Sequence, residues 1–182
     1  MNKMIKLPLF LGICGAACAG ILAGINSFTA PVIEQAKIDK ANAAYISMYS
    51  SFGVTSEHIT IEDAELYEAG CTTKAIIVND NVKGITYTCS AKGYAGTISF
   101  QVAFANGQYL AYTDLGHGET DGFGKDVIDN FTNLIKGISS DTKLMDNSSY
   151  TSAIAGKSIT GKALANAIEV CRADYATWYA AQ

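Results

Sequence analysis

Two runs of alternating residues, joined by Asn106-Gly107, constrain the fold of this 182-residue chain more than any other feature. Polar and apolar residues alternate from Thr97 to Val102, which is the pattern of a strand with one buried face. Asn-Gly between two such runs is the strongest short-range signal for a hairpin, because both residues tolerate the positive φ of a tight turn. We therefore expect antiparallel strands over 96–105 and 108–115.

A second hairpin and a helix are expected on either side of this one. The turn-type tripeptide Asn79-Asp80-Asn81 separates the strand-like runs 74–78 and 82–89. Apolar residues recur at helical spacing over 126–136, and Gly137 is a fitting end for that helix.

Helices are also expected near both ends of the chain. Residues 34–48 are rich in alanine and compatible with a helix, whereas 50–57 resemble a loop. The last helix is expected to start near Thr160, and its apolar stripe ends in Trp178 and Tyr179. Together these patterns predict an α+β fold, in which a small antiparallel sheet carries helices on one side.

The N-terminal quarter has the composition of a membrane span. No charged residue lies between Lys6 and Glu34, and the apolar run Leu7–Ile25 has roughly the 20 residues needed to cross a bilayer. Lys3 and Lys6 precede it, so the positive-inside rule predicts a cytoplasmic N-terminus and an extracytoplasmic remainder. A single transmembrane helix is the expected form, and a cleaved signal peptide is the alternative.

Composition gives no support to a nucleic-acid partner. The net charge is −4 and the isoelectric point is about 5.1. No basic stripe and no interleaving of aromatic with basic residues is present, so the electrostatic footprint of a nucleic-acid-binding surface is missing.

The cysteines show no metal-binding spacing. The chain has five, and Cys71, Cys89 and Cys171 are scattered without a C-x-x-C pair. This argues against structural zinc, c-type haem and cysteine-ligated iron–sulfur clusters, so we assign no metal ligand. A disulfide between Cys71 and Cys89 is possible, but no spacing rule decides it.

The segment Ser152–Gly161 is the strongest clue to function. It is a small, hydroxyl-rich loop that runs into an amphipathic helix, whose first amides and positive dipole end suit a phosphate. Ser158 adds a hydroxyl to which a phosphate could be bonded. Gly156-Lys157-Ser158 also looks like the end of a P-loop, but position 151 is threonine where that motif needs glycine, so we reject triphosphate binding.

Three motifs carry a family resemblance. Gly93-Tyr94-Ala95-Gly96 precedes a strand, Gly116–Gly124 lies between a strand and a helix, and Ser152–Gly161 follows near the C-terminus. In order and spacing they resemble the FMN-binding domain of the G subunit of Rnf-type ion-translocating oxidoreductases and of the related C subunit of sodium-translocating NADH:quinone reductase. The resemblance divides the chain into a membrane anchor (1–30), a helical connector (31–60) and an FMN-binding domain (61–182).

The resemblance implies FMN as the cofactor, attached through a phosphoester to Ser158. The other residues that it places near the cofactor come from the same two loops: Gly156, Lys157, Thr160, Glu119, Thr120, Gly122 and Gly124. Glu119 and Thr120 would supply polar contacts, and the glycines would let backbone approach the flat ring. The flavin does the redox work, so no side chain is assigned as catalytic.

The function implied is that of a membrane-anchored subunit that passes electrons through FMN inside an ion-translocating complex. It would have no turnover alone, and its partners would be the other membrane subunits and a flavin transferase. Ser152, Ala155 and Lys157 depart from the family pattern, which has an acidic residue, Ser or Thr, and Ala there. A structural or binding subunit without covalent flavin, or a standalone exported flavin carrier, therefore remains an alternative, and Ser158 could be an ordinary N-cap serine.

Overall fold

The computed structural model of the chain describes residues 42–66 and 70–182, together with positions 12, 15, 18–20, 24 and 29. Contacts divide the chain into two units, Met1–Ala44 and Tyr45–Gln182. The expected membrane span Leu7–Ile25 lies mostly outside the described residues. Within the part that is described, no helix combines the length and the apolar character needed to cross a bilayer.

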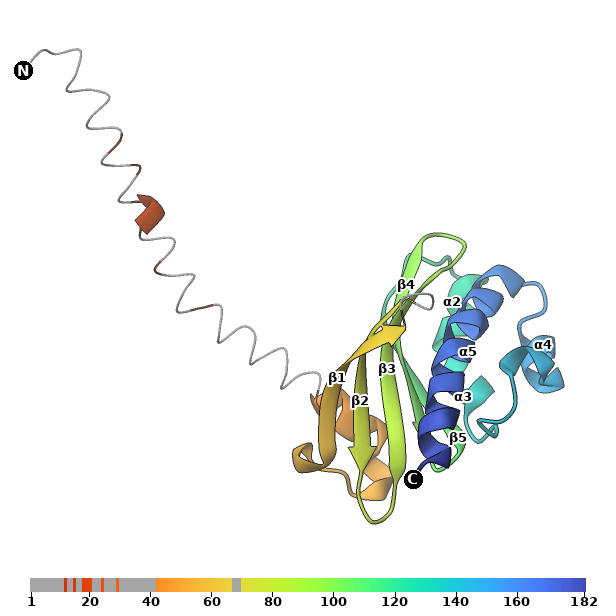
Figure 1. The fold of residues 1–182 in the computed structure, drawn as a ribbon. Coiled ribbons are helices and arrows are strands. Elements are labelled where there is room, and N and C mark those ends of the chain that lie inside the picture. The colour runs from red at the N-terminus through yellow and green to blue at the C-terminus, as the bar shows by residue number, and fades with distance from the viewer. Residues whose placement is uncertain are drawn as a thin grey trace, which may run out of the picture. The chain divides into compact units, whose positions relative to one another are not determined.

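Five antiparallel strands form one sheet in chain order, as Figure 1 shows. Their bounds are β1 Ile59–Leu66, β2 Cys71–Val78, β3 Lys83–Lys92, β4 Thr97–Ala105 and β5 Gln108–Gly116. Both expected hairpins are confirmed. Asn106 and Gly107 have φ of 49° and 78°, as the tight turn requires, and the Asn79 side chain accepts hydrogen bonds from the amides of Asn81 and Val82.

Four α-helices follow the sheet, and in the described part of the chain three short 3₁₀ turns lie among the other elements. The helices are α2 Gly124–Asp129, α3 Phe131–Ile135, α4 Ser148–Ala153 and α5 Ser158–Ala180. The 3₁₀ turns are η1 Ser50–Phe52, η2 Ser56–His58 and η4 Leu144–Asp146. Residues 42–48 are helical, as expected from composition, whereas β1, α4 and the 3₁₀ turns were not predicted as such.

The expectation of one continuous helix over 126–136 is wrong, because the chain breaks at Asn130. The Thr132 hydroxyl donates to the Tyr112 carbonyl at 2.8 Å and accepts from the Tyr112 amide at 3.0 Å. These two bonds fasten α3 to the edge strand β5.

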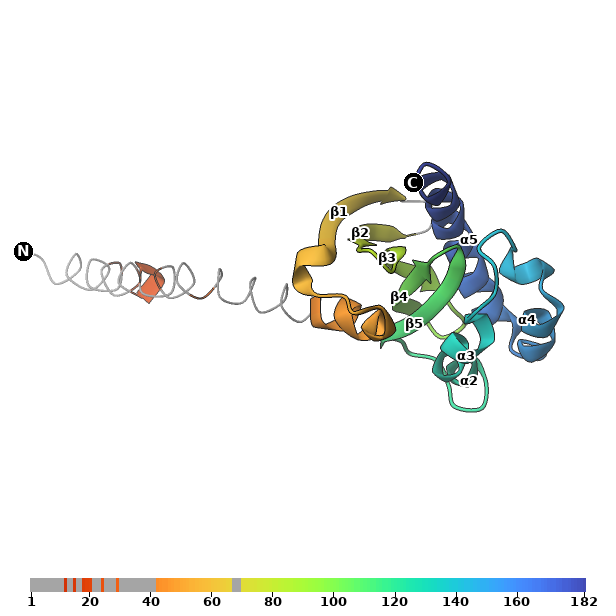
Figure 2. The same cartoon turned by 90° about the horizontal axis from the view of Figure 1, so that it is seen from below.

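The main core lies between the sheet and the helices, which occupy one side of it in Figure 2. Phe104 of β4 stacks on Tyr175 of α5, with ring centroids 4.9 Å apart, and lies equally close to Tyr109 of β5. All three side chains are buried. Burial raises the pKa of Tyr175 to about 12, as expected for a phenol held away from water.

The opposite face of the sheet is covered by the segment 45–58, which Figure 2 shows on the side away from α5. The buried Tyr49 hydroxyl donates to the Phe104 carbonyl at 2.8 Å and accepts from the Thr86 hydroxyl at 3.2 Å. Gly84 makes this approach possible, because a Cβ there would lie 2.7 Å from the Tyr49 ring. The two faces thus enclose separate apolar layers.

A disulfide joins Cys71 of β2 to Cys89 of β3, which resolves the pairing that the sequence left open. The buried thiol of Cys171, on α5, lies beside this bond. Three cysteines that are scattered along the sequence therefore meet at one point of the fold.

Candidate functional site

A pocket of about 420 Å³ opens where the β3–β4 turn, the loop from β5 to α2 and the start of α5 meet. Its lining residues come from these three segments: Tyr94, Glu119, Thr120, Phe123, Gly124, Gly156, Lys157, Ser158, Ile159 and Thr160. The fold thus brings together every residue that the sequence placed near a cofactor except Gly122, which does not line the pocket.

Glu119 holds the three segments together. One carboxylate oxygen accepts from the Ala95 amide at 2.9 Å, and the other accepts from the Thr160 hydroxyl at 2.7 Å. The side chain is 8% exposed, so both bonds lie largely away from water. Both oxygens of Glu119 are therefore engaged with the protein itself, whereas the sequence suggested a role in direct contact with a ligand.

Two glycines make room for this carboxylate. A Cβ on Gly124 would lie 2.6 Å from the Thr160 hydroxyl, and both Gly124 and Gly93 pass directly against the Glu119 carboxylate. Gly122 has a φ of 79°, a conformation that favours glycine. Gly124 thus makes room for Glu119 and Gly122 shapes the turn; their predicted role in the approach of a flavin ring stays a prediction.

The first turn of α5 is fixed by tight packing just behind it. Gly156 turns the chain with a φ of 79°, and α5 begins at Ser158, two residues earlier than expected. Buried Ile154 lies against Gly161, where a Cβ would come within 2.7 Å of it. The Tyr150 hydroxyl also donates to the Gly161 carbonyl at 2.7 Å.

Unpaired donors gather at this helix start. Among the described residues, none accepts a hydrogen bond from the amides of Ser158, Ile159 or Thr160. The half-buried Ser158 hydroxyl has no hydrogen-bond partner in this part of the chain either. Ser158 is therefore not an N-cap: it is the first helical residue, and the N-cap position belongs to Lys157, whose side chain makes no capping bond.

Lys157 is held by a residue that sequence reasoning missed. Its ammonium lies 2.5 Å from a carboxylate oxygen of Asp126, and the other oxygen of Asp126 accepts from the Gly122 amide at 3.1 Å. The bond from Lys157 lowers the pKa of the Asp126 carboxyl. This ion pair joins α2 to the start of α5 and turns the lysine toward α2. In the sequence, Asp126 stands only as the first residue of an expected helix, so nothing there marked it as a site residue.

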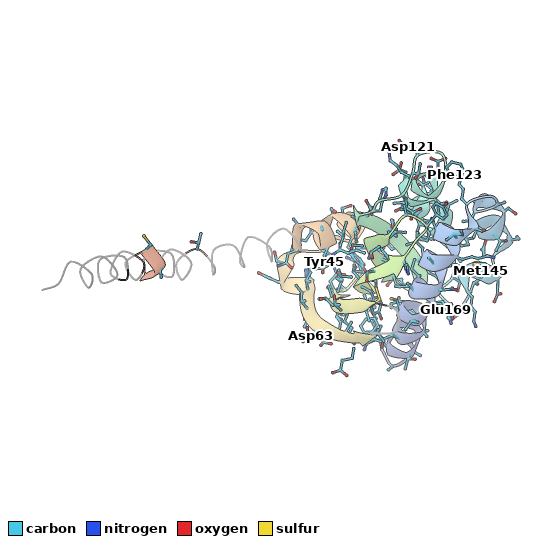
Figure 3. The ribbon with its side chains drawn as sticks, turned by 90° about the horizontal axis from the view of Figure 1, so that it is seen from above. Tyr45, Asp63, Asp121, Phe123, Met145 and Glu169 are labelled. Carbon is cyan, nitrogen blue, oxygen red and sulfur yellow. A yellow bond between two sulfur atoms is a disulfide. The ribbon has the colours of Figure 1, made fainter. Side chains whose placement is uncertain are left out.

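The rim of the pocket is apolar and exposed. Tyr94 is 74% exposed, Phe123 63% and Ile159 58%, although all three are large hydrophobic side chains. Figure 3 shows Phe123 beside Asp121 at the outer end of the loop from β5 to α2. Aromatic walls beside a cluster of amide and hydroxyl donors match a ligand with a flat ring at one end and an anion at the other, which is the chemistry of FMN.

Comparisons with known proteins agree with this geometry. Residues 93–172 match the family model described as FMN-binding domain, a span that contains all three segments of the pocket. The chain is similar to the G subunit of the ion-translocating oxidoreductase complex of Shewanella piezotolerans (strain WP3 / JCM 13877), with 24% identity over 186 residues that cover 93% of this chain and 88% of the relative. This chain therefore carries an FMN-binding domain resembling that of the Rnf-type G subunits, and FMN is its cofactor.

Proposed function

We propose that this chain is a membrane-anchored subunit of an ion-translocating oxidoreductase complex, in which it passes electrons through FMN bonded to Ser158. One observation carries the proposal: the Ser158 hydroxyl and the free amides of the first turn of α5 line the same pocket as the aromatic rim. When bound, FMN supplies one- and two-electron transfer, and the protein supplies position and electrostatics.

The start of α5 suits the phosphate of FMN. Bonding to the Ser158 hydroxyl leaves a phosphodiester with one negative charge. The positive end of a helix dipole stabilises such a charge by about 0.3–1 kcal/mol, and the amides of Ile159 and Thr160 are available as donors. Tyr94 and Phe123 would flank the ring, and Glu119 would hold the three surrounding segments in register.

A covalent link also suits the compartment that we propose. Residues 1–30 would anchor the chain in the membrane, and residues 31–60 would link this anchor to the flavin domain. Residues 61–182 would form that domain on the extracytoplasmic side. No pool of free flavin surrounds a protein there, so a bond makes retention independent of affinity. A flavin transferase would form the phosphoester, and the other membrane subunits of the complex would exchange electrons with the flavin.

The test is the fluorescence of the denatured protein. The full chain is produced together with the flavin transferase of its own source, denatured and separated on a gel, and the band is examined for flavin. Ser158→Ala is expected to abolish the fluorescence, because it removes the only oxygen to which we assign the bond. Ser152→Ala, which removes an exposed hydroxyl of the same segment, is the matched control and should keep it.

Mass spectrometry of the peptide that contains Ser158 gives the second measurement. The mass of this peptide should exceed that of the unmodified peptide by the mass of one FMN minus one water. Fluorescence that persists in Ser158→Ala would move the bond to another residue. An unmodified peptide from protein made with its transferase would instead favour a structural or binding subunit without covalent flavin. Lys157, which departs from the family pattern beside the attachment position and is paired with Asp126, supports that alternative.

A further inference from the structure

We propose that Cys71, Cys89 and Cys171 form, once their disulfide is reduced, a binding site for one Cu⁺ ion. The site is separate from the flavin pocket, since none of the three residues lines that pocket. Every cysteine between residues 45 and 182 takes part, although the three come from β2, β3 and α5. Their sulfur atoms all lie within 4.8 Å of one another.

The geometry already has the form of a three-sulfur donor set. The Cys171 sulfur lies 3.1 Å from that of Cys71 and 3.4 Å from that of Cys89. These nearly equal distances put Cys171 beside the disulfide and not in line with it. In-line approach is what thiol–disulfide exchange needs, so the arrangement suits a shared ligand better than a direct exchange of partners.

The number and kind of ligands select the ion. Soft thiolate sulfur favours Cu⁺ and Zn²⁺ among common biological metals. Structural zinc takes four ligands, and among the described residues no His, Asp, Glu or further Cys joins these three to complete a tetrahedron. Three sulfurs suffice for Cu⁺, so the site favours the monovalent ion.

The three sulfur atoms are shielded from water. Cys71 and Cys171 are 0% exposed and Cys89 is 3% exposed, so a bound ion would be cut off from the solvent. Water is then not available as a fourth ligand, and the ion would be held by the three sulfurs alone.

The disulfide acts as the gate of this site. In the oxidised form two of the three sulfurs are bonded to each other and cannot take an ion. A dithiol reductant opens the bond in two exchange steps: Cys71 and Cys89 each gain one electron and one proton, and the reductant becomes a cyclic disulfide. Cu⁺ then enters without any change in its own oxidation state, and the displaced thiol protons pass to the buffer.

The experiment uses the full chain with Cys14→Ala and Cys18→Ala, so that these three cysteines are the only sulfur ligands of their kind. The protein is reduced without oxygen, freed of reductant and titrated with Cu⁺ against a chromophoric Cu⁺ chelator. We expect one equivalent of copper to move to the protein. The oxidised protein and reduced Cys171→Ser should each hold copper at least tenfold more weakly, and Cys171→Ser keeps Cys71 and Cys89 as the matched control.

X-ray absorption at the copper edge tests the proposal without any variant of the site. Three sulfur neighbours are expected in the loaded protein. Copper that stays with the chelator, equal binding by Cys171→Ser, or a spectrum with two sulfur neighbours would each overturn the proposal and leave Cys171 as a packing residue. Circular dichroism shows whether Cys171→Ser is folded; if it is not, the absorption spectrum decides.

Discussion

The first turn of α5 and the remainder of the same helix are built on different principles. The first turn adds polar bonds to the packing of Ile154 against Gly161: Thr160 donates to Glu119, and Lys157, just before the turn, is paired with Asp126. Further along, α5 is held by close apolar packing, as where Tyr175 stacks on Phe104. The first part lines an open pocket, whereas the packed face of the second part is buried against the sheet.

The difference separates stability from ligand binding. Burial of apolar area supplies most of the free energy of folding, whereas a paired polar group adds little net but is costly to leave alone. We expect the packed part of α5 to govern unfolding, and the polar start of α5 to govern what binds in the pocket. Substitutions in the packed part should therefore lower the free energy of unfolding, whereas substitutions around the pocket should change flavin binding.

Phe104→Ala is expected to have the largest effect on stability. Removing this fully buried ring should cost about 3–5 kcal/mol of the free energy of unfolding, because it leaves a cavity against Tyr175 and Tyr109. Urea unfolding measures the loss. FMN bound per folded molecule should not change, because Phe104 does not line the pocket.

Phe123→Ala is the matched control, since it removes the same side chain from the rim of the pocket. Phe123 is 63% exposed, so its loss should change the free energy of unfolding by no more than about 0.5 kcal/mol. It should instead alter the flavin absorption spectrum. Equal destabilisation by the two substitutions would refute the separation of the packed core, which governs unfolding, from the rim of the pocket.

The strands of the sheet on which α5 packs were predicted well from the sequence. Alternation over Thr97–Val102 and the turn at Asn106-Gly107 identify strands that the structure contains, because period and turn chemistry are local properties. The break at Asn130 was not predicted, and it lies beside a bond from Thr132 to Tyr112 of β5 that local periodicity does not reveal.

The fold brings the two predicted loops to one pocket, but the bonds within that pocket were not predicted. Family resemblance brought the two loops together, and the fold does the same. The partners of Glu119 and Lys157 could not be inferred, because Ala95 bonds through a backbone amide that any residue would supply and Asp126 lies outside the three motifs. Likewise, no spacing rule unites three cysteines that meet only when α5 packs on the sheet.

Glu119→Ala should have the next largest effect and should act on both properties. It leaves the Ala95 amide and the buried Thr160 hydroxyl without their acceptor, and the unsatisfied buried hydroxyl alone should cost about 1–3 kcal/mol. The three segments around the pocket would also lose their common anchor, so FMN content should fall together with the urea midpoint.

Two further variants show whether this loss is specific. Glu119→Gln keeps one carbonyl acceptor and should lose less stability than Glu119→Ala. Thr120→Ala changes the exposed neighbour and should be near neutral for unfolding. If Thr120→Ala were as destabilising as Glu119→Ala, the carboxylate would not be the element that joins the segments.

Asp126→Asn is expected to have the smallest effect, and pH should reveal it. Lys157 lowers the pKa of the folded Asp126 carboxyl, so the stability from this pair is present above the ordinary aspartate pKa of about 3.9 and is lost as pH falls through the folded-state value. The pair is partly exposed, so its contribution is small and salt weakens it further. The urea midpoints of wild type and Asp126→Asn should differ at pH 7 and converge toward pH 3. A difference that is constant over this range would mean that the asparagine disturbs packing, and Lys157→Met, which breaks the same pair from the other side, should then show no matching pH dependence.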